Sequence, residues 1–322
     1  MKVSVIIPIY KVEAYIERCA RSLFRQTLSE AEFIFIDDCT PDQSMVILNE
    51  LIGEYHERIT LMGWLVRIER MPKNSGQAAV RRYGMQIATG DYIAFCDSDD
   101  WMEASMLREM YEKAVSEDCD VVVCDFNKEI NGNIKNRKGM RFAGELPFVK
   151  ELLLAKSCWN LWNKLFRRSL YTEHQLLFPS DGNNMGEDIV LTIEMVYFSR
   201  KVGYINNALY NYCENSTSIM HQLSDDVFIM HQNQLTNNIG TLEAFFKLNN
   251  DTNYKNELSC LKCKVKIEMI NTAIYNIHPK QWLKLFPELY FRVLTNPYVG
   301  LRSKLVYYKW SIICVIRSLR RH

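Results

Sequence analysis

The feature that most constrains the fold of this chain is the regular alternation of short apolar segments with amphipathic segments over residues 1–125. Val3–Pro8 is a continuous apolar run, typical of a strand buried on both faces of a parallel sheet. Val12–Gln26 follows with apolar residues at helical spacing. Such alternation predicts an α/β fold built on a Rossmann-like, doubly wound and mostly parallel sheet. Further strands are expected at Phe33–Ile36, Leu65–Ile68, Tyr92–Cys96 and Val121–Cys124, with helices at Gly76–Ala88 and Met102–Ser116.

Acidic residues follow two of the expected strands. Asp37-Asp38 comes directly after the second strand, and the run Asp97-Ser98-Asp99-Asp100 follows the fourth. Ligands of doubly wound sheets bind beyond the carboxyl ends of the strands, so these acids fall on the edge where a site is expected.

The acidic run at residues 97–100 has two interpretations. Aspartate is favoured in turns and at helix N-caps, so the run could be a solvated turn. Three like charges in four residues also repel one another, and a divalent cation would relieve that repulsion. Carboxylate oxygens suit Mg²⁺ or Mn²⁺, often shared with substrate phosphates.

The pattern loosens after residue 125, which divides the chain into three parts. Residues 1–125 form the alternating part, residues 126–220 a mixed part, and residues 221–322 a helical part. A hairpin or loop is expected at Asn127–Arg141 and a helix at Asp188–Ser199. Near residue 40 we expect Thr40 to cap a helix that begins at Pro41.

Composition excludes several classes of protein. Lys and Arg number 39 and Asp and Glu 38, so no overall charge favours nucleic acid, and no nucleic-acid partner is expected. The ten cysteines lie mostly in apolar runs, where a thiol behaves as a small hydrophobic group. The first apolar run is too short for a signal peptide or a membrane span, so a cytoplasmic location is expected.

Several motifs occur in the order found in family 2 inverting glycosyltransferases with the GT-A fold, and the chain resembles that family over residues 1–220. The likeness implies a sugar nucleotide donor, expected to be a UDP-sugar, and a Mn²⁺ or Mg²⁺ cofactor. It also implies work on bacterial surface polysaccharides, with a glycan or lipid-linked acceptor. The motifs are Val3–Tyr10, Ile36–Asp38, Asn74–Gly76, Thr89–Trp101, Asn163–Arg168 and Gly186–Asp188.

The resemblance implies a role for each matching residue. Asp188 is expected to be the catalytic base that deprotonates the acceptor hydroxyl, and Asp99 is expected to bind the metal. Glu187 is a competing base, because only one of two adjacent helical residues is expected to face the site. The expected donor-binding residues are Pro8, Tyr10, Asp38, Arg81, Asp97 and Ser98, and further donor or acceptor contacts are expected from Asp100, Trp101 and Glu187.

Some positions depart from the family pattern. Lys11 stands where asparagine is usual, Cys39–Asp42 replaces a Gly-Ser-Thr-Asp-like turn, and Arg82 also replaces an asparagine. Two alternative functions therefore stay open. A sugar nucleotidyltransferase would need a glycine-rich basic loop after the first strand, which Tyr10–Glu13 is not. A catalytically inactive, membrane-associated scaffold subunit would need neither donor nor metal.

Weaker signals favour structural roles. The pair Cys260 and Cys263 has no partner set for a zinc site, and Trp159 and Trp162 are expected in the core, although either could stack on a sugar. Trp101 is expected near the donor or acceptor.

The last 23 residues are basic and amphipathic. Residues 300–322 contain six Lys and Arg and no acid, and seven apolar residues share one helical stripe. This pattern suits the surface of an anionic membrane, on the inner face of the cell membrane, but a helix packed on the domain is the alternative. A homo-oligomer is also possible. The stripe comprises Leu301, Leu305, Tyr308, Ile312, Val315, Ile316 and Leu319.

Overall fold

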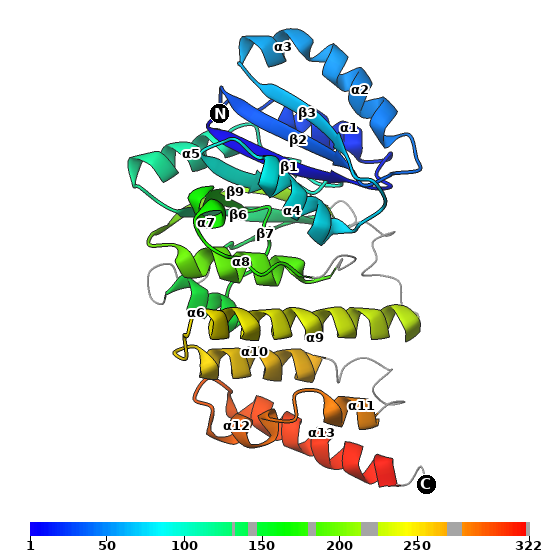
Figure 1. Cartoon of the computed structure of the whole chain (residues 1–322), viewed down its shortest axis with the longest axis vertical. Helices are drawn as coiled ribbons and strands as arrows, with labels where there is room; N and C mark the ends of the chain where they lie inside the picture. The colour runs from blue at the N-terminus through cyan, green and yellow to red at the C-terminus, as the bar shows by residue number, and fades with distance from the viewer. Residues whose placement is uncertain (131–132, 141–146, 180–184, 214–224, 269–278, 320–322) are drawn as a thin grey trace.

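A computed structural model describes residues 1–130, 133–140, 147–179, 185–213, 225–268 and 279–319. Its described strands form one nine-stranded sheet in the order β3-β2-β1-β4-β8-β6-β9-β5, with β7 paired to β6 (Figure 1). The strands are β1 (Val3–Ile9), β2 (Ala31–Asp37), β3 (Leu65–Arg70), β4 (Tyr92–Phe95), β5 (Trp101–Met102), β6 (Val121–Ile130), β7 (Asn133–Arg137), β8 (Lys164–Arg167) and β9 (Val202–Cys213).

The first half of the sheet is parallel, as the sequence predicts. Strands β3, β2, β1 and β4 run parallel, and their carboxyl ends carry the two acidic segments. Beyond β4 the sheet is mixed, because β8 is antiparallel to both β4 and β6, while β6 and β9 pair in parallel. The expected hairpin after residue 126 is present as the β6–β7 pair.

Helices cover both faces of the sheet. The helices of the first two parts are α1 (Ile16–Leu23), α2 (Ser44–Glu54), α3 (His56–Leu61), α4 (Gln77–Ile87), α5 (Met106–Ser116), α6 (Phe148–Leu153), α7 (Ser169–Thr172) and α8 (Glu187–Phe198). Buried side chains of the sheet alternate between two clusters, with Ile6 and Ile34 on one face and Val5 and Phe33 on the other. Helix α4 lies close to the sheet because Gly84 has no side chain. A Cβ atom there would lie 2.5 Å from Cγ2 of Ile6.

Three helix starts differ from the sequence-based prediction, since α1 begins at Ile16 rather than Val12, and α2 and α5 also begin later than expected. Helix α2 begins at Ser44 rather than Pro41. Near its start, Asp42 rather than Thr40 accepts hydrogen bonds from the backbone N–H and the hydroxyl of Ser44. Helix α5 begins at Met106 because Trp101–Met102 pairs with β9 as strand β5. For α2 and α5, a tertiary contact rather than local helix propensity decides where the helix begins.

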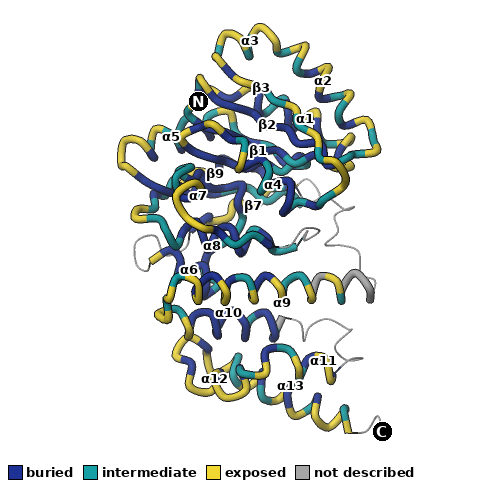
Figure 2. Tube along the Cα trace, in the orientation of Figure 1, coloured by how far each residue is buried: buried dark blue, intermediate teal, exposed yellow. Residues whose placement is uncertain are grey.

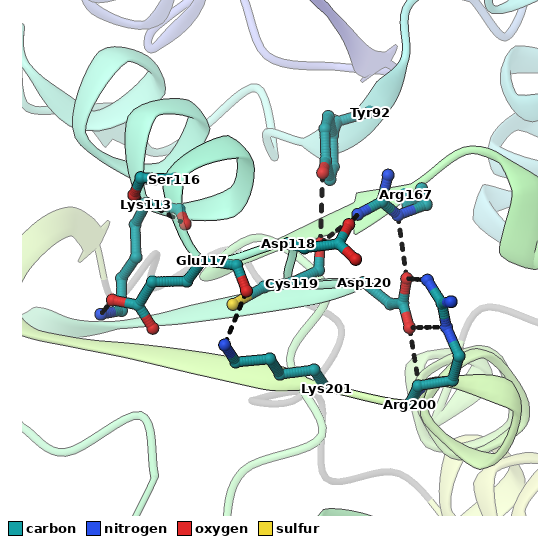
Figure 3. Close-up of polar contacts among 10 residues, drawn as sticks. All are labelled: Tyr92, Lys113, Ser116, Glu117, Asp118, Cys119, Asp120, Arg167, Arg200 and Lys201. Carbon is teal, nitrogen blue, oxygen red and sulfur yellow. Dashed lines mark hydrogen bonds and ion pairs between the residues drawn. The ribbon is translucent and has the colours of Figure 1, made fainter.

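A network of ion pairs joins the amino-terminal ends of β6 and β9, at the edge of the sheet remote from the acidic segments. The buried carboxylate of Asp120 accepts hydrogen bonds from Arg167 of β8 (Nε–Oδ1, 2.9 Å) and from Arg200, which precedes β9 (Figure 3). A buried carboxylate with two arginine partners has its charge compensated. These basic residues therefore have a structural role at the sheet corner.

The described residues after 224 are mainly helical, as expected. Its helices are α9 (Asp225–Leu248), α10 (Lys255–Glu268), α11 (Pro279–Lys284), α12 (Leu289–Thr295) and α13 (Leu301–Leu319), and they stack in layers beneath α8 (Figure 1). Their core is continuous with one face of the sheet, through residues such as Phe245 and Leu261. No described helix has the length and apolar character needed to cross a membrane.

Candidate active site

A cavity of about 1000 Å³ opens at the carboxyl edge of the parallel strands. It brings together nine of the eleven residues that the sequence singles out, from segments almost 180 residues apart. Metal candidate Asp99 and base candidate Asp188 both line it, so the two acidic segments share one cleft. The nine residues are Pro8, Tyr10, Asp38, Arg81, Asp97, Ser98, Asp99, Glu187 and Asp188.

Two candidates, Asp100 and Trp101, are not among the residues that line the cavity. Asp100 is buried, and its carboxylate accepts hydrogen bonds from the hydroxyl of Tyr210 (2.8 Å) and the backbone N–H of Cys213 (2.8 Å). Burial raises the pKa of Asp100 well above its usual value, and neighbouring Asp99 adds to the effect. Trp101 is held in strand β5 opposite Asn211. In this structure, both residues join the acidic run to β9.

The central cation of the site is Arg81, on helix α4. Its guanidinium donates to Asp97 Oδ1 (Nη2, 2.6 Å) through one branch and to Glu187 Oε1 through the other. Arg81 is only 3% exposed, and its Nε has no hydrogen-bond partner within the described part of the chain. Burial by itself lowers the pKa of Arg81, but the two carboxylates outweigh it and the pKa is raised. Arg81 thus bridges the two acidic segments.

Residues Glu187 and Asp188 both line the cavity, contrary to the expectation that only one would. They have different environments: Glu187 is buried against Arg81, whereas Asp188 is partly exposed. Burial raises the pKa of Glu187 to about 7, with Arg81 opposing the effect. Burial likewise raises the pKa of Asp188, again with Arg81 opposing it. The partly exposed carboxylate is the one accessible to a substrate hydroxyl.

The turn before α8 depends on the helical part of the chain. Gly186 precedes the helix with a φ of 71°, which favours glycine. Asn238 of α9 is buried and donates to the carbonyl of Met185 (2.8 Å). A Cβ atom on Gly186 would lie 3.2 Å from Nδ2 of Asn238. Helix α9 therefore supports the turn that presents Glu187 and Asp188.

Asp38 has structural partners as well as a place in the cavity wall. Its two carboxylate oxygens accept the backbone N–H groups of Ser75 (2.7 Å) and Gly76 (2.9 Å). Burial raises the pKa of Asp38, and these two hydrogen bonds oppose the effect. Asp38 thereby fixes the loop that leads into α4, and through it the position of Arg81.

One wall of the cavity is aromatic, and sequence analysis did not assign it. Trp162 stacks on Tyr210 with ring centres 4.4 Å apart and on Tyr212 at 5.8 Å, while Phe126 meets Trp162 edge-on. Trp162 is 6% exposed, which agrees with the expected core position, yet it also lines the cavity. The signal was present in the sequence as Trp162 and Tyr212, but their stacking depends on the β6–β9 pairing.

A buried lysine shapes the loop that carries Trp162. Lys164 is fully buried, and its ammonium donates to the carbonyls of Cys158 (3.0 Å) and Asn160 (2.5 Å) and to Oδ1 of Asn163 (2.9 Å). Burial lowers the pKa of Lys164. The Asn163-Lys164 pair therefore stabilises this loop from behind the cavity.

Gln77 is a further residue that sequence analysis missed. Its side-chain amide donates to Asp97 Oδ1 (3.1 Å) and lines the cavity. The sequence signal that could have identified Gln77 is its position directly after Gly76, in the first turn of α4.

The carboxylates of the cavity suit a divalent cation shared with a ligand. No group of three or more His, Cys, Asp and Glu side chains converges on one point in the described ranges, so a fully protein-bound metal site is not formed there. Asp97 is committed to Arg81 and Asp100 to Tyr210, whereas Asp99 lies in the cavity wall between them. One carboxylate beside an open cavity fits Mg²⁺ or Mn²⁺, which commonly complete their coordination with substrate phosphates and water.

The other weak signals have structural explanations. All ten cysteines are unpaired thiols, and Cys260 and Cys263 are both buried in the helical core. Trp159 donates its indole N–H to the carbonyl of Leu152 (2.9 Å).

Comparisons with known proteins agree with this geometry. The family model described as "Glycosyl transferase family 2" matches residues 4–191. The putative glycosyltransferase EpsH of Bacillus subtilis is 31% identical over 70% of this chain, and the match spans 64% of EpsH, less than two thirds of its length. The crystal structure of S. aureus TarS 1-349 covers 100% of this chain and 92% of its own, with 21% identity and a TM-score of 0.67. A mannosyltransferase of Pyrobaculum calidifontis, solved in complex with GDP-Man and Mn²⁺, covers 99% of this chain and 87% of its own, with 15% identity and a TM-score of 0.54.

Proposed function

This chain belongs to glycosyl transferase family 2, and we propose that it transfers a sugar from a UDP-sugar to a hydroxyl group of a glycan or lipid-linked acceptor, with inversion and with the help of a divalent metal. The observation that carries the proposal is the shared cavity. Acids from the end of β4 and from the start of α8 line it together, and Arg81 bridges them.

The donor is assigned to the side of the cavity formed by β1, β2 and β4. Pro8, Tyr10 and Asp38 lie there at strand ends, in position to contact a nucleotide base. TarS 1-349, whose fold this chain shares, has been solved with UDP, which supports UDP as the nucleotide to test first. Asp97 and Ser98 would then lie towards the ribose.

The metal is assigned to Asp99. When bound, a divalent cation stabilises the negative charge that accumulates on a diphosphate leaving group. The Pyrobaculum mannosyltransferase was solved with Mn²⁺, which supports Mn²⁺ as the first ion to test. Arg81 holds Asp97 in place next to this residue.

The base is assigned to Asp188. Its carboxylate takes the proton of the acceptor hydroxyl while the acceptor oxygen bonds to the anomeric carbon from the side opposite the diphosphate. The bond from that carbon to the diphosphate breaks in the same step, and its electron pair leaves with UDP, so configuration inverts. General-base assistance of this kind contributes about 10²–10⁴ to the rate. Glu187 is buried and paired with Arg81, so Asp188 is the carboxylate that an acceptor hydroxyl can reach.

The acceptor is assigned to the aromatic wall. The side chains of Phe126, Trp162 and Tyr212 line the cavity, and aromatic faces suit the C–H surfaces of sugar rings. Lys128 also lines this side, with its ammonium 5.6 Å from the ring centre of Tyr212. A partly anionic glycan would suit this combination.

The proposal is tested by measuring UDP release from a panel of UDP-sugars, with and without Mn²⁺ and with simple glycoside acceptors. Metal-dependent UDP release that increases with an acceptor, and a product of inverted anomeric configuration, are expected. The absence of both turnover and donor-induced thermal stabilisation across the panel would favour the inactive scaffold instead.

A further inference from the structure

The carboxyl-terminal helix α13 packs on the protein through a narrow face that is not its most apolar one. Tyr307, Ser311 and Cys314 are its buried residues, and they lie at spacings of four and three on one side of the helix. This face packs against α11 and α10, where Tyr307 meets Trp282 with ring centres 5.6 Å apart. The helix is therefore anchored, and its opposite side faces outward.

The outward side of α13 is exposed (Figure 2), and large apolar side chains recur along it from Leu301 to Leu319. At 100° per residue, Leu301, Leu305, Ile312, Ile316 and Leu319 fall within about 60° of one another. Leu305 is 64% exposed and Ile312 58%. The helix thus turns the predicted apolar stripe away from the protein rather than into it. This is the reverse of an ordinary surface helix, whose apolar stripe faces the core.

Helix α12 extends the same exposed surface. Phe291 is 81% exposed, and Leu294 and Tyr290 are also exposed. The two helices are joined by hydrogen bonds from Tyr308 to the carbonyl of Tyr290 (2.6 Å) and from Lys304 to the carbonyl of Leu294 (2.7 Å). We call this surface the outer face, defined by Tyr290, Phe291, Leu294, Leu301, Leu305, Ile312, Val315, Ile316 and Leu319.

The stretch of sequence that carries the outer face is basic. After Glu288 the sequence contains no acidic residue, but it contains seven basic ones. Arg302, Lys309 and Arg317 are exposed on α13 beside the apolar side chains. The seven are Arg292, Arg302, Lys304, Lys309, Arg317, Arg320 and Arg321.

We propose that the outer face binds the surface of an anionic lipid bilayer. Exposed apolar side chains on two neighbouring helices, within a stretch of sequence that has seven cations and no acids, match the acyl boundary and the anionic headgroups of such a surface. A second copy fits less well, because a two-fold contact through this face would bring the same cations towards one another. The helix lies on the bilayer rather than crossing it. This inference does not depend on the proposed transfer activity, although a lipid-linked acceptor would make such binding useful.

The experiment is flotation of the full chain with phosphatidylcholine vesicles prepared with and without phosphatidylglycerol, at low and high salt. The test variant carries Leu305→Gln, Ile312→Gln and Ile316→Gln. The matched control carries Val46→Gln, Leu61→Gln and Val115→Gln, three residues of comparable exposure on other helices. We expect the wild type and the control to float with anionic vesicles only, less so at high salt. The test variant should lose about tenfold or more of this binding.

Three results would overturn the proposal. They are equal binding by the test variant, no binding by the wild type, or a concentration-dependent dimer in ultracentrifugation that the test variant abolishes. Thermal unfolding of the test variant checks that it is folded, and transfer to a soluble acceptor checks the cavity separately. A wild type that floats but does not turn over UDP-sugars would contradict the proposed function and leave the membrane inference intact.

Discussion

In most proteins charged side chains are exposed and large apolar side chains are buried, and the sheet region and the helical region of this protein depart from that pattern in opposite ways. Around the cavity of the sheet region, charged groups are buried: Arg81 and Glu187 are 3% exposed, and Asp100 is 1% exposed. On α12 and α13 of the helical region, large apolar side chains such as Phe291 and Leu305 are exposed. Each region nevertheless has an ordinary apolar core behind its exceptional surface.

This difference indicates which surface of each region contacts another molecule. Burying charge is costly unless it is paired, so a cluster of buried charges beside an open cavity indicates selection for a ligand. Exposing a continuous apolar surface is costly in a different way, since it promotes association. We therefore propose a small polar ligand for the sheet region and an extended apolar surface as the partner of the helical region.

The largest effect is expected from removing the proposed catalytic base, Asp188, from the cavity. Asp188→Asn should reduce transfer about 10²–10⁴-fold while the unfolding temperature stays close to that of the wild type, because the side chain keeps its size. The measurement is UDP release with saturating donor and acceptor. Asp118→Asn, a change in an exposed carboxylate at the sheet corner, serves as the control. Normal turnover by Asp188→Asn would show that another group is the base.

Removing the bridging cation tests whether the buried charges depend on one another. Arg81→Met removes the cation that Asp97 and Glu187 share, and we expect a loss of about 3–5 kcal/mol in the free energy of unfolding. Arg21→Met, which removes ion pairs to the exposed Glu17 and Glu54, should cost about 1 kcal/mol or less.

Denaturant titration measures both changes. The double variant Arg81→Met with Glu187→Gln should recover part of the loss, because it removes one of the two uncompensated charges. Additive effects of the two substitutions would argue against a direct coupling.

The two sides of α13 provide a matched pair within one helix. Tyr307→Ala should cost about 3 kcal/mol, since the ring is buried against Trp282. Leu305→Ala, two residues earlier on the exposed side, should change the free energy of unfolding by only about 0.5 kcal/mol. Equal losses in the two variants would mean that the outer face is covered in the free protein.

The last expected effect is a pH dependence of stability. Burial raises the pKa of Glu187 from 4.5 to about 7, so the folded protein holds this proton more tightly than the unfolded chain does. The free energy of unfolding should therefore decrease as the pH rises from 4.5 towards 7. Glu187→Gln should flatten this slope, which denaturant midpoints measured over that pH range will show. An unchanged slope would locate the titrating group elsewhere.

Local sequence patterns predicted three strands of the parallel half closely, but they misplaced the starts of α1, α2 and α5. The strands β1, β2 and β4 fall within two residues of their predicted bounds, because a strand buried on both faces must be apolar throughout. The predicted start of α2 was wrong: its N-cap is Gln43, which makes no side-chain cap hydrogen bond, while Asp42 accepts a hydrogen bond from the distant backbone N–H of Glu13. Local helix propensity carries no information about that contact.

The roles within the acidic run could not be separated from the sequence. Asp97, Asp99 and Asp100 are chemically identical, yet one pairs with Arg81, one lies in the cavity wall and one is bound by Tyr210. Arg81 was expected among the donor-binding residues, and in this structure its two branches hold Asp97 and Glu187. Tyr210 and Glu187 are respectively 110 and 106 residues from their partners Asp100 and Arg81, so no short-range spacing reveals the pairing.

By itself, the sequence determined the parallel half of the sheet, the edge at which the acids lie and the amphipathic character of the last helix. These are local properties, since burial of a strand and the periodicity of a helix are recorded in neighbouring residues. Only the tertiary structure decided that Glu187 meets Asp97 through Arg81, that Asp100 is structural, and that α13 buries Tyr307 while its apolar stripe stays outside. Those outcomes depend on which distant elements pack together, and the free energy of such packing is a property of the whole chain.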